Sequence, residues 1–164
     1  MNKYKAGFKY TITHLRGEEV ISEEIQHNLI PTEGLNYIIG TSAAAVAQIT
    51  AWYLGIYEGN YTPVAGDTMS TFPGSSTEST AYTEATRVAW TAGTVSAGAV
   101  SNSASAATFT INATKTIYGA FMSSVSTKSA TTGTLLSAVL FASPKAVVSG
   151  DILNITSTLT LVAV

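Results

Sequence analysis

The sequence predicts a mainly β protein, a β-sandwich or jelly roll with an N-terminal β-hairpin and one α-helix. Three observations lead to this fold class. Apolar and polar residues alternate with period two near both ends of the chain, and short β-prone segments recur between Gly, Pro and Asp turns in the C-terminal half. Only one stretch has the periodicity of a helix. A chain of 164 residues suits a single fold of this kind.

Residues 3–15 are expected to form the first strand, because successive side chains point to opposite faces of a sheet. One face would carry apolar residues and the other lysines, namely Tyr4, Ala6, Phe8, Tyr10 and Ile12 against Lys3, Lys5 and Lys9. After a turn at Arg16 and Gly17, a more acidic strand returns over 20–29. Pairs of lysine with Glu18, Glu19, Glu23 or Glu24 would support this hairpin. We expect residues 1–30 to be an arm that is separable from a sandwich domain at 31–164.

A helix is expected near 32–48, opened by Pro31. Its apolar residues recur on one face with a period near 3.6, and we expect that face to pack on a sheet. These residues are Leu35, Ile38, Ile39, Ala43, Val46 and Ile49. The uncharged stretch 35–57 is long enough to span a bilayer, but polar residues interrupt it and no basic cluster flanks it. A helix that ends and is followed by a strand is the better interpretation.

Further strands are expected at 52–57, 82–90, 107–112, 115–123, 135–141 and in a last strand around 153–161. In the last strand, we expect Leu153, Ile155, Leu159 and Leu161 to face inward. Between the strands, residues 58–81 carry turn signals in quick succession. Loops of this length usually bind something or pack on a neighbour.

Charged residues make up only 11% of the chain, against roughly 25% in an ordinary domain. Ser, Thr, Ala and Gly take their place, and such a surface favours close subunit packing because interface cores are depleted in charge. The chain has no cysteine, which excludes disulfides, thiolate metal sites and cysteine nucleophiles. The first residues are not followed by an apolar segment, so we expect no signal peptide and synthesis in the cytoplasm.

The residues do not predict catalysis, a metal site or a cofactor. His14 and His27 are the only histidines, so bases that could activate a serine are scarce. We expect both to be solvated or at an interface, with a two-histidine metal site as a weaker alternative. Glu78 and Glu84 could form a glycosidase pair, although their loop context argues against it. Asp151 is expected to serve the turn before the last strand.

Nucleic acid is not an expected partner, because the lysines near the N-terminus are offset by glutamates. A set of aromatic residues has two interpretations, a stacking platform for sugars or core packing. Core packing is favoured, because Trp52 alternates with Leu54 and Ile56. The set comprises Trp52, Tyr53, Tyr57, Tyr61, Phe72, Tyr82 and Trp90.

Four segments, 29–36 (LIPTEGLN), 52–63 (WYLGIYEGNYTP), 86–90 (TRVAW) and 147–153 (VVSGDIL), together resemble the capsid decoration, or cement, proteins of short-tailed bacteriophages. The resemblance spans nearly the whole chain but includes no sharp functional motif. It implies a jelly-roll-like sandwich that is oligomeric on the virion surface and bridges subunits of the major capsid protein. No catalytic residue is implied.

The charged hairpin is the expected contact with the capsid. The candidate residues are Lys3, Tyr4, Lys5, Phe8, Lys9, Arg16, Glu18 and Glu19. Two alternatives come from other classes. One is a tail- or fibre-associated protein that binds host surface glycans through the aromatic loop between Tyr57 and Trp90. The other is a hydrolase that would depend on His14 and His27.

Overall fold

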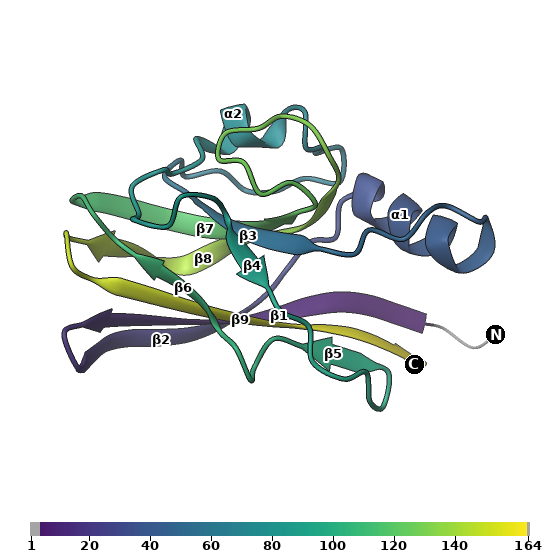
Figure 1. Cartoon of the computed structure of the whole chain (residues 1–164), viewed down its shortest axis with the longest axis horizontal. Coiled ribbons are helices and arrows are strands. Elements are labelled where there is room, and N and C mark those ends of the chain that lie inside the picture. The colour runs from purple at the N-terminus through teal and green to yellow at the C-terminus, as the bar shows by residue number, and fades with distance from the viewer. Residues whose placement is uncertain (1–3, 164) are drawn as a thin grey trace.

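The computed structural model describes the backbone of residues 4–163 and the side chains of residues 6–161. Two antiparallel sheets pack face to face (Figure 1). The elements are β1 (Tyr4–Arg16), β2 (Glu19–His27), α1 (Thr32–Ala43), β3 (Trp52–Tyr57), α2 (Phe72–Ser76), β4 (Val88–Trp90), β5 (Ala99–Ser101), β6 (Ala107–Thr110), β7 (Lys115–Ser123), β8 (Leu135–Val147) and β9 (Ile152–Ala163). The mainly β prediction, with its hairpin and one substantial helix, is therefore confirmed.

The five-stranded sheet has the order β2-β1-β9-β5, with β6 also paired to β9, and the four-stranded sheet has the order β4-β3-β7-β8. Period-two alternation supplies the core between them, because every second residue of the long strands is apolar and points inward. Phe8, Tyr10 and Ile12 from β1 are at most 1% exposed, and they pack with Leu153 and Ile155 of β9.

The N-terminal hairpin forms as predicted, with β1 and β2 paired from Lys9 opposite His27 to Arg16 opposite Glu19. It is built into the sandwich rather than attached to it. β1 pairs with β9 from Tyr4 to Leu15, and its inner face is part of the core. The arm that the sequence suggests at residues 1–30 is thus continuous with the sheet, because β1 carries apolar residues that only the second sheet can cover.

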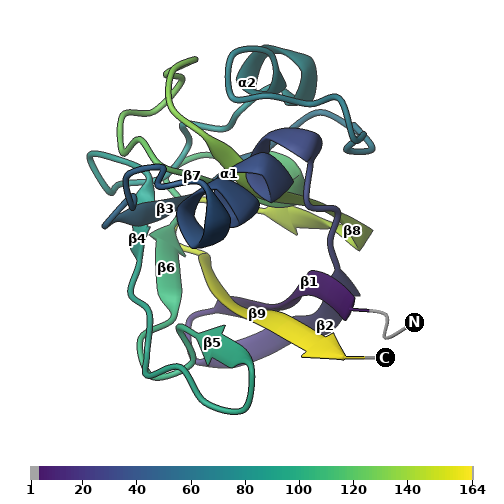
Figure 2. The ribbon, with the colours of Figure 1, turned by 90° about the vertical axis from the view of Figure 1, so that its right-hand side faces the viewer.

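The helix α1 lies at one end of the sandwich, the same end at which both described chain ends lie (Figure 1 and Figure 2). It ends at Ala43 rather than near residue 48. Its predicted apolar face is wrong in part, since Leu35 is 38% and Ile39 62% exposed. The buried positions are Gly34 and Gly40. A Cβ atom at Gly34 would overlap the backbone of Leu136, so the helix approaches β8 closely at Gly34, while Gly40 is covered by Val46.

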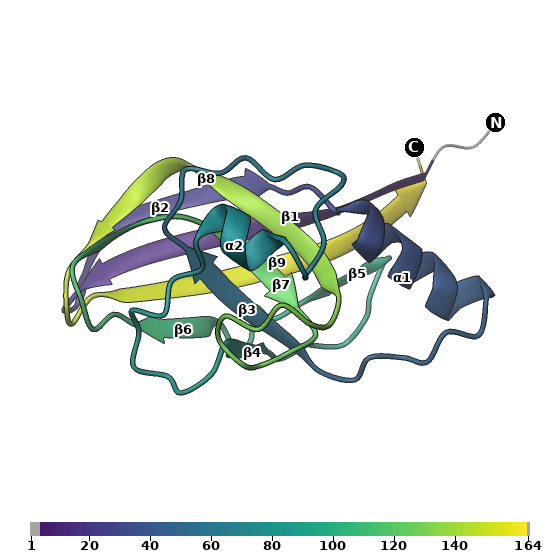
Figure 3. The same cartoon turned by 90° about the horizontal axis from the view of Figure 1, so that it is seen from above.

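Other strands begin or end at different residues from those predicted. The strand predicted at 82–90 is regular only at β4, and β8 continues to Val147, beyond the predicted 135–141. The three-residue β5 was not predicted. Residues 58–81 are mostly loop, as expected, and contain α2, which lies above the four-stranded sheet (Figure 3). Leu161 is 55% exposed, because β9 extends past the covered part of the sheet.

Two aromatic rings on β3 and β7 each occupy the space above a glycine of the facing strand. Tyr57 lies opposite Gly119, and Phe121 lies opposite Gly55. A Cβ atom at either glycine would overlap the ring opposite it. Each ring therefore lies flat against the facing backbone, and each strand supplies one ring and one glycine.

Candidate assembly surface

The outer face of the five-stranded sheet is rich in threonine. This face results from the alternation along each strand, because residues adjacent in sequence to the buried core residues must point outward. Register places these side chains next to one another across β1, β6 and β9. We call this surface the threonine face, and it consists of Thr11, Thr13, Thr108, Thr110, Asn154, Thr156 and Thr158.

Hydrogen bonds between side chains order part of this face. Thr13 Oγ1 donates to Glu23 Oε2 at 3.2 Å, and Thr108 Oγ1 donates to Asn154 Oδ1 at 2.8 Å. Thr13 and Asn154 are themselves opposite each other. One row of polar side chains therefore crosses four strands, from β2 through β1 and β9 to β6. Such cross-strand pairs hold the side chains in one arrangement before any partner binds.

An apolar margin borders the threonine face along the edge strand β2. Val20 is 55% exposed and Ile25 is 54% exposed, and both point outward with Leu15. A register shift between His14 and Leu15 adds Ile21, which is 44% exposed. β2 is paired on one side only. An edge strand that exposes branched apolar side chains is a surface that a partner can cover.

The face carries little charge. Of its described outward side chains, only Lys9 and Glu23 carry a formal charge. Charged groups are costly to desolvate, whereas threonine combines a methyl group with one hydroxyl. A partner could therefore exclude water from most of this face without burying unpaired ions.

The tip of the hairpin is anchored by Asp151, which is 1% exposed. Its carboxylate accepts hydrogen bonds from Arg16 Nε at 2.9 Å and Nη2 at 2.8 Å, and it lies 2.8 Å from His14 Nε2. It also accepts the backbone N–H of Val148, as its predicted turn role requires. These bonds, above all those from Arg16, hold the pKa of the Asp151 carboxyl well below its usual range, although burial opposes them.

This cluster corrects the expectation that His14 is solvated or at an interface. His14 is not solvated but buried at 2% exposure, because its position alternates with the core residues of β1. His27 is exposed and lies on the opposite face, so the two histidines do not form a metal site. Within residues 6–161, no group of three or more His, Asp or Glu side chains is arranged to hold a metal ion.

The hairpin's charges pair with the rest of the sandwich. Among the described side chains, no ion pair joins β1 to β2, contrary to the expected lysine–glutamate pairs. Glu24 points inward instead, and its Oε2 lies 2.8 Å from Nζ of Lys145 on β8. Its two carboxylate oxygens also accept the backbone N–H groups of Ala142 and Ser143. Glu24 thereby closes one side of the sandwich between β2 and β8.

The structure separates the residues that the sequence suggests for the capsid contact. Lys3 lies outside the described residues, and the backbone of Tyr4 and Lys5 belongs to β1, but their side chains are not described. Phe8 is 1% exposed and belongs to the core, so it is not a contact residue on the free surface. The remaining four, Lys9, Arg16, Glu18 and Glu19, are exposed. The alternation of the strands places the threonines outward, as expected, but sequence reasoning did not single out this face or Ile25 as a contact surface.

Glu78 and Glu84 do not form a glycosidase pair, because each is occupied by structural bonds. Glu78 pairs with Arg87 at 2.7 Å, and both side chains are at most 2% exposed. The carboxylate of Glu84 accepts the backbone N–H of Thr110 from both oxygens, at 3.2 and 3.1 Å. Both glutamates hold loops in place.

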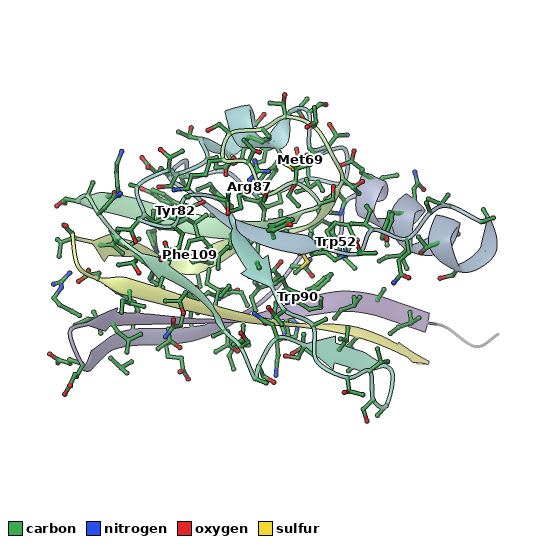
Figure 4. The ribbon with its side chains drawn as sticks, in the orientation of Figure 1. Trp52, Met69, Tyr82, Arg87, Trp90 and Phe109 are labelled. Carbon is green, nitrogen blue, oxygen red and sulfur yellow. The ribbon has the colours of Figure 1, made fainter. Side chains whose placement is uncertain are left out.

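The predicted aromatic set contains both buried and partly buried residues, of which Figure 4 labels Trp52, Tyr82 and Trp90. Tyr57, Phe72 and Tyr82 are at most 1% exposed and pack in the core, which agrees with the favoured interpretation. Tyr82 meets Phe109 edge to face at 5.0 Å between centroids. Trp52 and Trp90 are different, because they are only partly buried and lie directly opposite each other on β3 and β4.

No helix within residues 4–163 is long and apolar enough to cross a membrane. No protein-family model, no curated protein and no solved structure matches the chain.

Proposed function

We propose that this protein is a virion structural protein that decorates and stabilises a bacteriophage capsid by bridging subunits of the major capsid protein. The observation that carries the proposal is the threonine face with its apolar margin, a wide and charge-poor surface on the hairpin side of the sandwich. The resemblance of four segments to cement proteins indicates that the surface binds a capsid shell.

In this proposal, the threonine face and the β2 edge bind the shell. The exposed Lys9, Arg16, Glu18 and Glu19 lie on the same hairpin and would form a polar rim around the apolar margin. A protein that binds only the expanded shell stabilises that state by mass action, and many copies increase the effect. Sister copies would associate through other surfaces, for which the exposed Leu35 and Ile39 of α1 are candidates.

The assignment of the sandwich to a jelly-roll-like type belongs to this proposal. Successive pairs of strands alternate between the two sheets, with β1 and β2 in the first, β3 and β4 in the second, β5 and β6 in the first, and β7 and β8 in the second. This alternation supports a double-sheet arrangement of the jelly-roll kind.

The test uses two matched substitutions of exposed apolar residues. Ile25→Lys places a charge within the apolar margin, and Val64→Lys places the same charge in the loop that precedes α2. The exposures are alike, 54% for Ile25 and 52% for Val64. Co-sedimentation with expanded capsids that lack decoration should show at least about tenfold weaker binding for Ile25→Lys and unchanged binding for Val64→Lys. Equal binding by both variants would refute the assignment of this face.

The location in the particle is tested directly by cryo-electron microscopy of the virion. Density for this chain at junctions between capsid subunits, with β2 toward the shell, is the expected result. Density confined to the tail would support the alternative function.

That alternative is a tail- or fibre-associated protein that binds host surface glycans, and it is favoured by one observation. Trp52 and Trp90 are only partly buried and adjacent, as stacking on a sugar requires. Titration with host surface glycans should then change tryptophan fluorescence at saturable concentrations, whereas the capsid proposal expects no change.

A further inference from the structure

A pocket of about 490 Å³ opens at the end of the sandwich that carries α1. Both sheets contribute to its walls, together with the helix and the segment that follows it. The apolar lining includes Phe8, Ile38, Trp52, Trp90, Leu136 and Leu159. The volume is in the range of small-molecule sites, which are lined mainly by apolar and aromatic side chains. This pocket is distinct from the threonine face, which lies on the outer side of the five-stranded sheet.

The pocket is formed by the way α1 ends. Residues 44–51 leave the helix as an irregular segment, and Gln48, Ile49 and Thr50 of this segment line the pocket before β3 begins. The backbone N–H of Ile49 donates to the hydroxyl of Tyr37 at 2.7 Å, which ties this segment to the helix. The Tyr37 ring in turn meets Trp52 edge to face at 5.2 Å between centroids. The lining is therefore held in place from two directions.

The lining has no charged side chain among the residues described. An ionic ligand buried here would lose its hydration without gaining a counter-charge, which strongly disfavours it. The polar members are few. Thr41 already donates its hydroxyl to backbone carbonyls of its own helix, while Gln48 is exposed and stands with Thr50 at the rim. A pyranose carries hydroxyl groups around its whole ring and would leave several of them unpaired in such a pocket.

One residue of the lining carries an unused donor, which is buried behind the pocket wall. The Nε1–H of Trp90 is inaccessible to solvent and has no hydrogen-bond acceptor. Buried donors without an acceptor are rare in folded proteins, and each costs free energy. An acceptor atom on a ligand that moves the Trp90 ring slightly would remove that cost.

We propose that this pocket binds a small, uncharged, mainly apolar molecule that carries one hydrogen-bond acceptor, packed between Trp52 and Trp90 of one sheet and Phe8 and Leu159 of the other. The acceptor would take the Nε1–H of Trp90 after the ring has turned to bring this donor to the pocket. This activity is additional to the proposed capsid binding and uses a different surface.

The experiment exploits the fact that the chain has two tryptophans and that both line this pocket. In a ¹H–¹⁵N correlation spectrum, the two indole N–H signals report on the pocket alone. The neutral probe is 2-naphthol, and the matched charged probe is naphthalene-2-sulfonate. Methyl β-glucoside tests the sugar interpretation. The expected result is that 2-naphthol shifts both indole signals in a saturable way, with the Trp90 signal moving more, and that the other two compounds leave them unchanged.

Two variants fill the pocket. Val100→Phe adds bulk from β5, and Ala92→Leu adds bulk at an exposed position, where the fold is not at risk. Val95→Phe is the matched control, since Val95 is 71% exposed and does not line the pocket. Filling should weaken 2-naphthol binding by about tenfold or more, and the control should bind as the unmodified protein does. The proposal is overturned if 2-naphthol leaves the indole signals unchanged, if the sulfonate or the glucoside binds equally well, or if both filled variants retain full affinity.

Discussion

Replacing Arg87 with Met should strongly destabilise the fold, although Arg87 is far from any proposed binding surface. Arg87 is 1% exposed and is the largest of the fully buried side chains. A guanidinium has five N–H donors, and here all five have acceptors. They are Glu78 Oε1 and Oε2, the Ser123 hydroxyl, and the carbonyls of Val125 and Ala130, at 2.7 to 3.2 Å. Arg87 thus joins the loop before β4 to the loop between β7 and β8 (Figure 4).

The expected magnitude follows from what the substitution leaves behind. The Glu78 carboxylate remains 2% exposed and keeps only one other donor, the backbone N–H of Ser129. Two carbonyl oxygens lose their donor as well. Removing one partner of a buried ion pair costs about 3–5 kcal/mol. Since a domain of this size is stable by roughly 5–15 kcal/mol, the loss would be a large part of the total.

Urea unfolding followed by circular dichroism measures this loss as a change in the free energy of unfolding. Lys9→Met is the control for removing a cation from an exposed site, and we expect a change within about 0.5 kcal/mol. The double variant Arg87→Met with Glu78→Gln should recover more than about 1 kcal/mol of the loss, because the uncompensated carboxylate is gone. A decrease of less than about 1 kcal/mol in the free energy of unfolding for Arg87→Met would refute the reasoning, since removing one partner of a buried ion pair should cost more than that.

Three further predictions follow from other features. Because the pKa of Asp151 is depressed, chiefly by Arg16, its stabilisation should be complete above about pH 4, the ordinary aspartate range, and be lost as the pH falls toward the depressed pKa; urea unfolding at several pH values should show a flatter dependence for Asp151→Asn, and parallel curves would contradict this. Gly119→Ala should cost about 1–3 kcal/mol by overlap with the Tyr57 ring, whereas Gly7→Ala, with open space around it, should change little; equal effects in thermal or urea unfolding would count against the packing argument. Deletion of residues 1–30 should abolish cooperative unfolding, since it removes the central strand β1 and its core side chains; a well-dispersed NMR spectrum of the shortened chain would show the hairpin to be dispensable.

The strands could be predicted because their information is local. Period two in β1 and β9 identifies their buried faces directly, and the same alternation assigns Thr11 and Thr156 to the outer face. The helix was predicted less well for a physical reason. Apolar periodicity favours a face with Leu35 and Ile39, but close approach to β8 favours the small residue Gly34, and backbone packing decided the orientation.

Contacts between distant residues could not be predicted from patterns. His14 and Asp151 are 137 positions apart and meet only because β1 and β9 pair. Arg87 carries no sequence signal that distinguishes it from an exposed arginine, since its acceptors come from Glu78 and from the distant segment 123–130. The pocket was missed for the same reason, because α1, β1, β3, β4, β5, β8 and β9 all contribute to its lining.

The exchange of rings and glycines between β3 and β7 also restricts how these strands can pair during folding. In the observed register, Tyr57 meets Gly119 and Phe121 meets Gly55. A shift by two residues in one direction would place Tyr57 against Phe121, two rings in the space of one. A shift in the other direction would place Gly55 against Gly119 and leave a void, and a shift by one would exchange side chains between the two buried faces of β3. Misaligned pairings are thus penalised by steric overlap, by a cavity or by mismatched packing, so that a chain with few charges to guide its strands can still align them correctly.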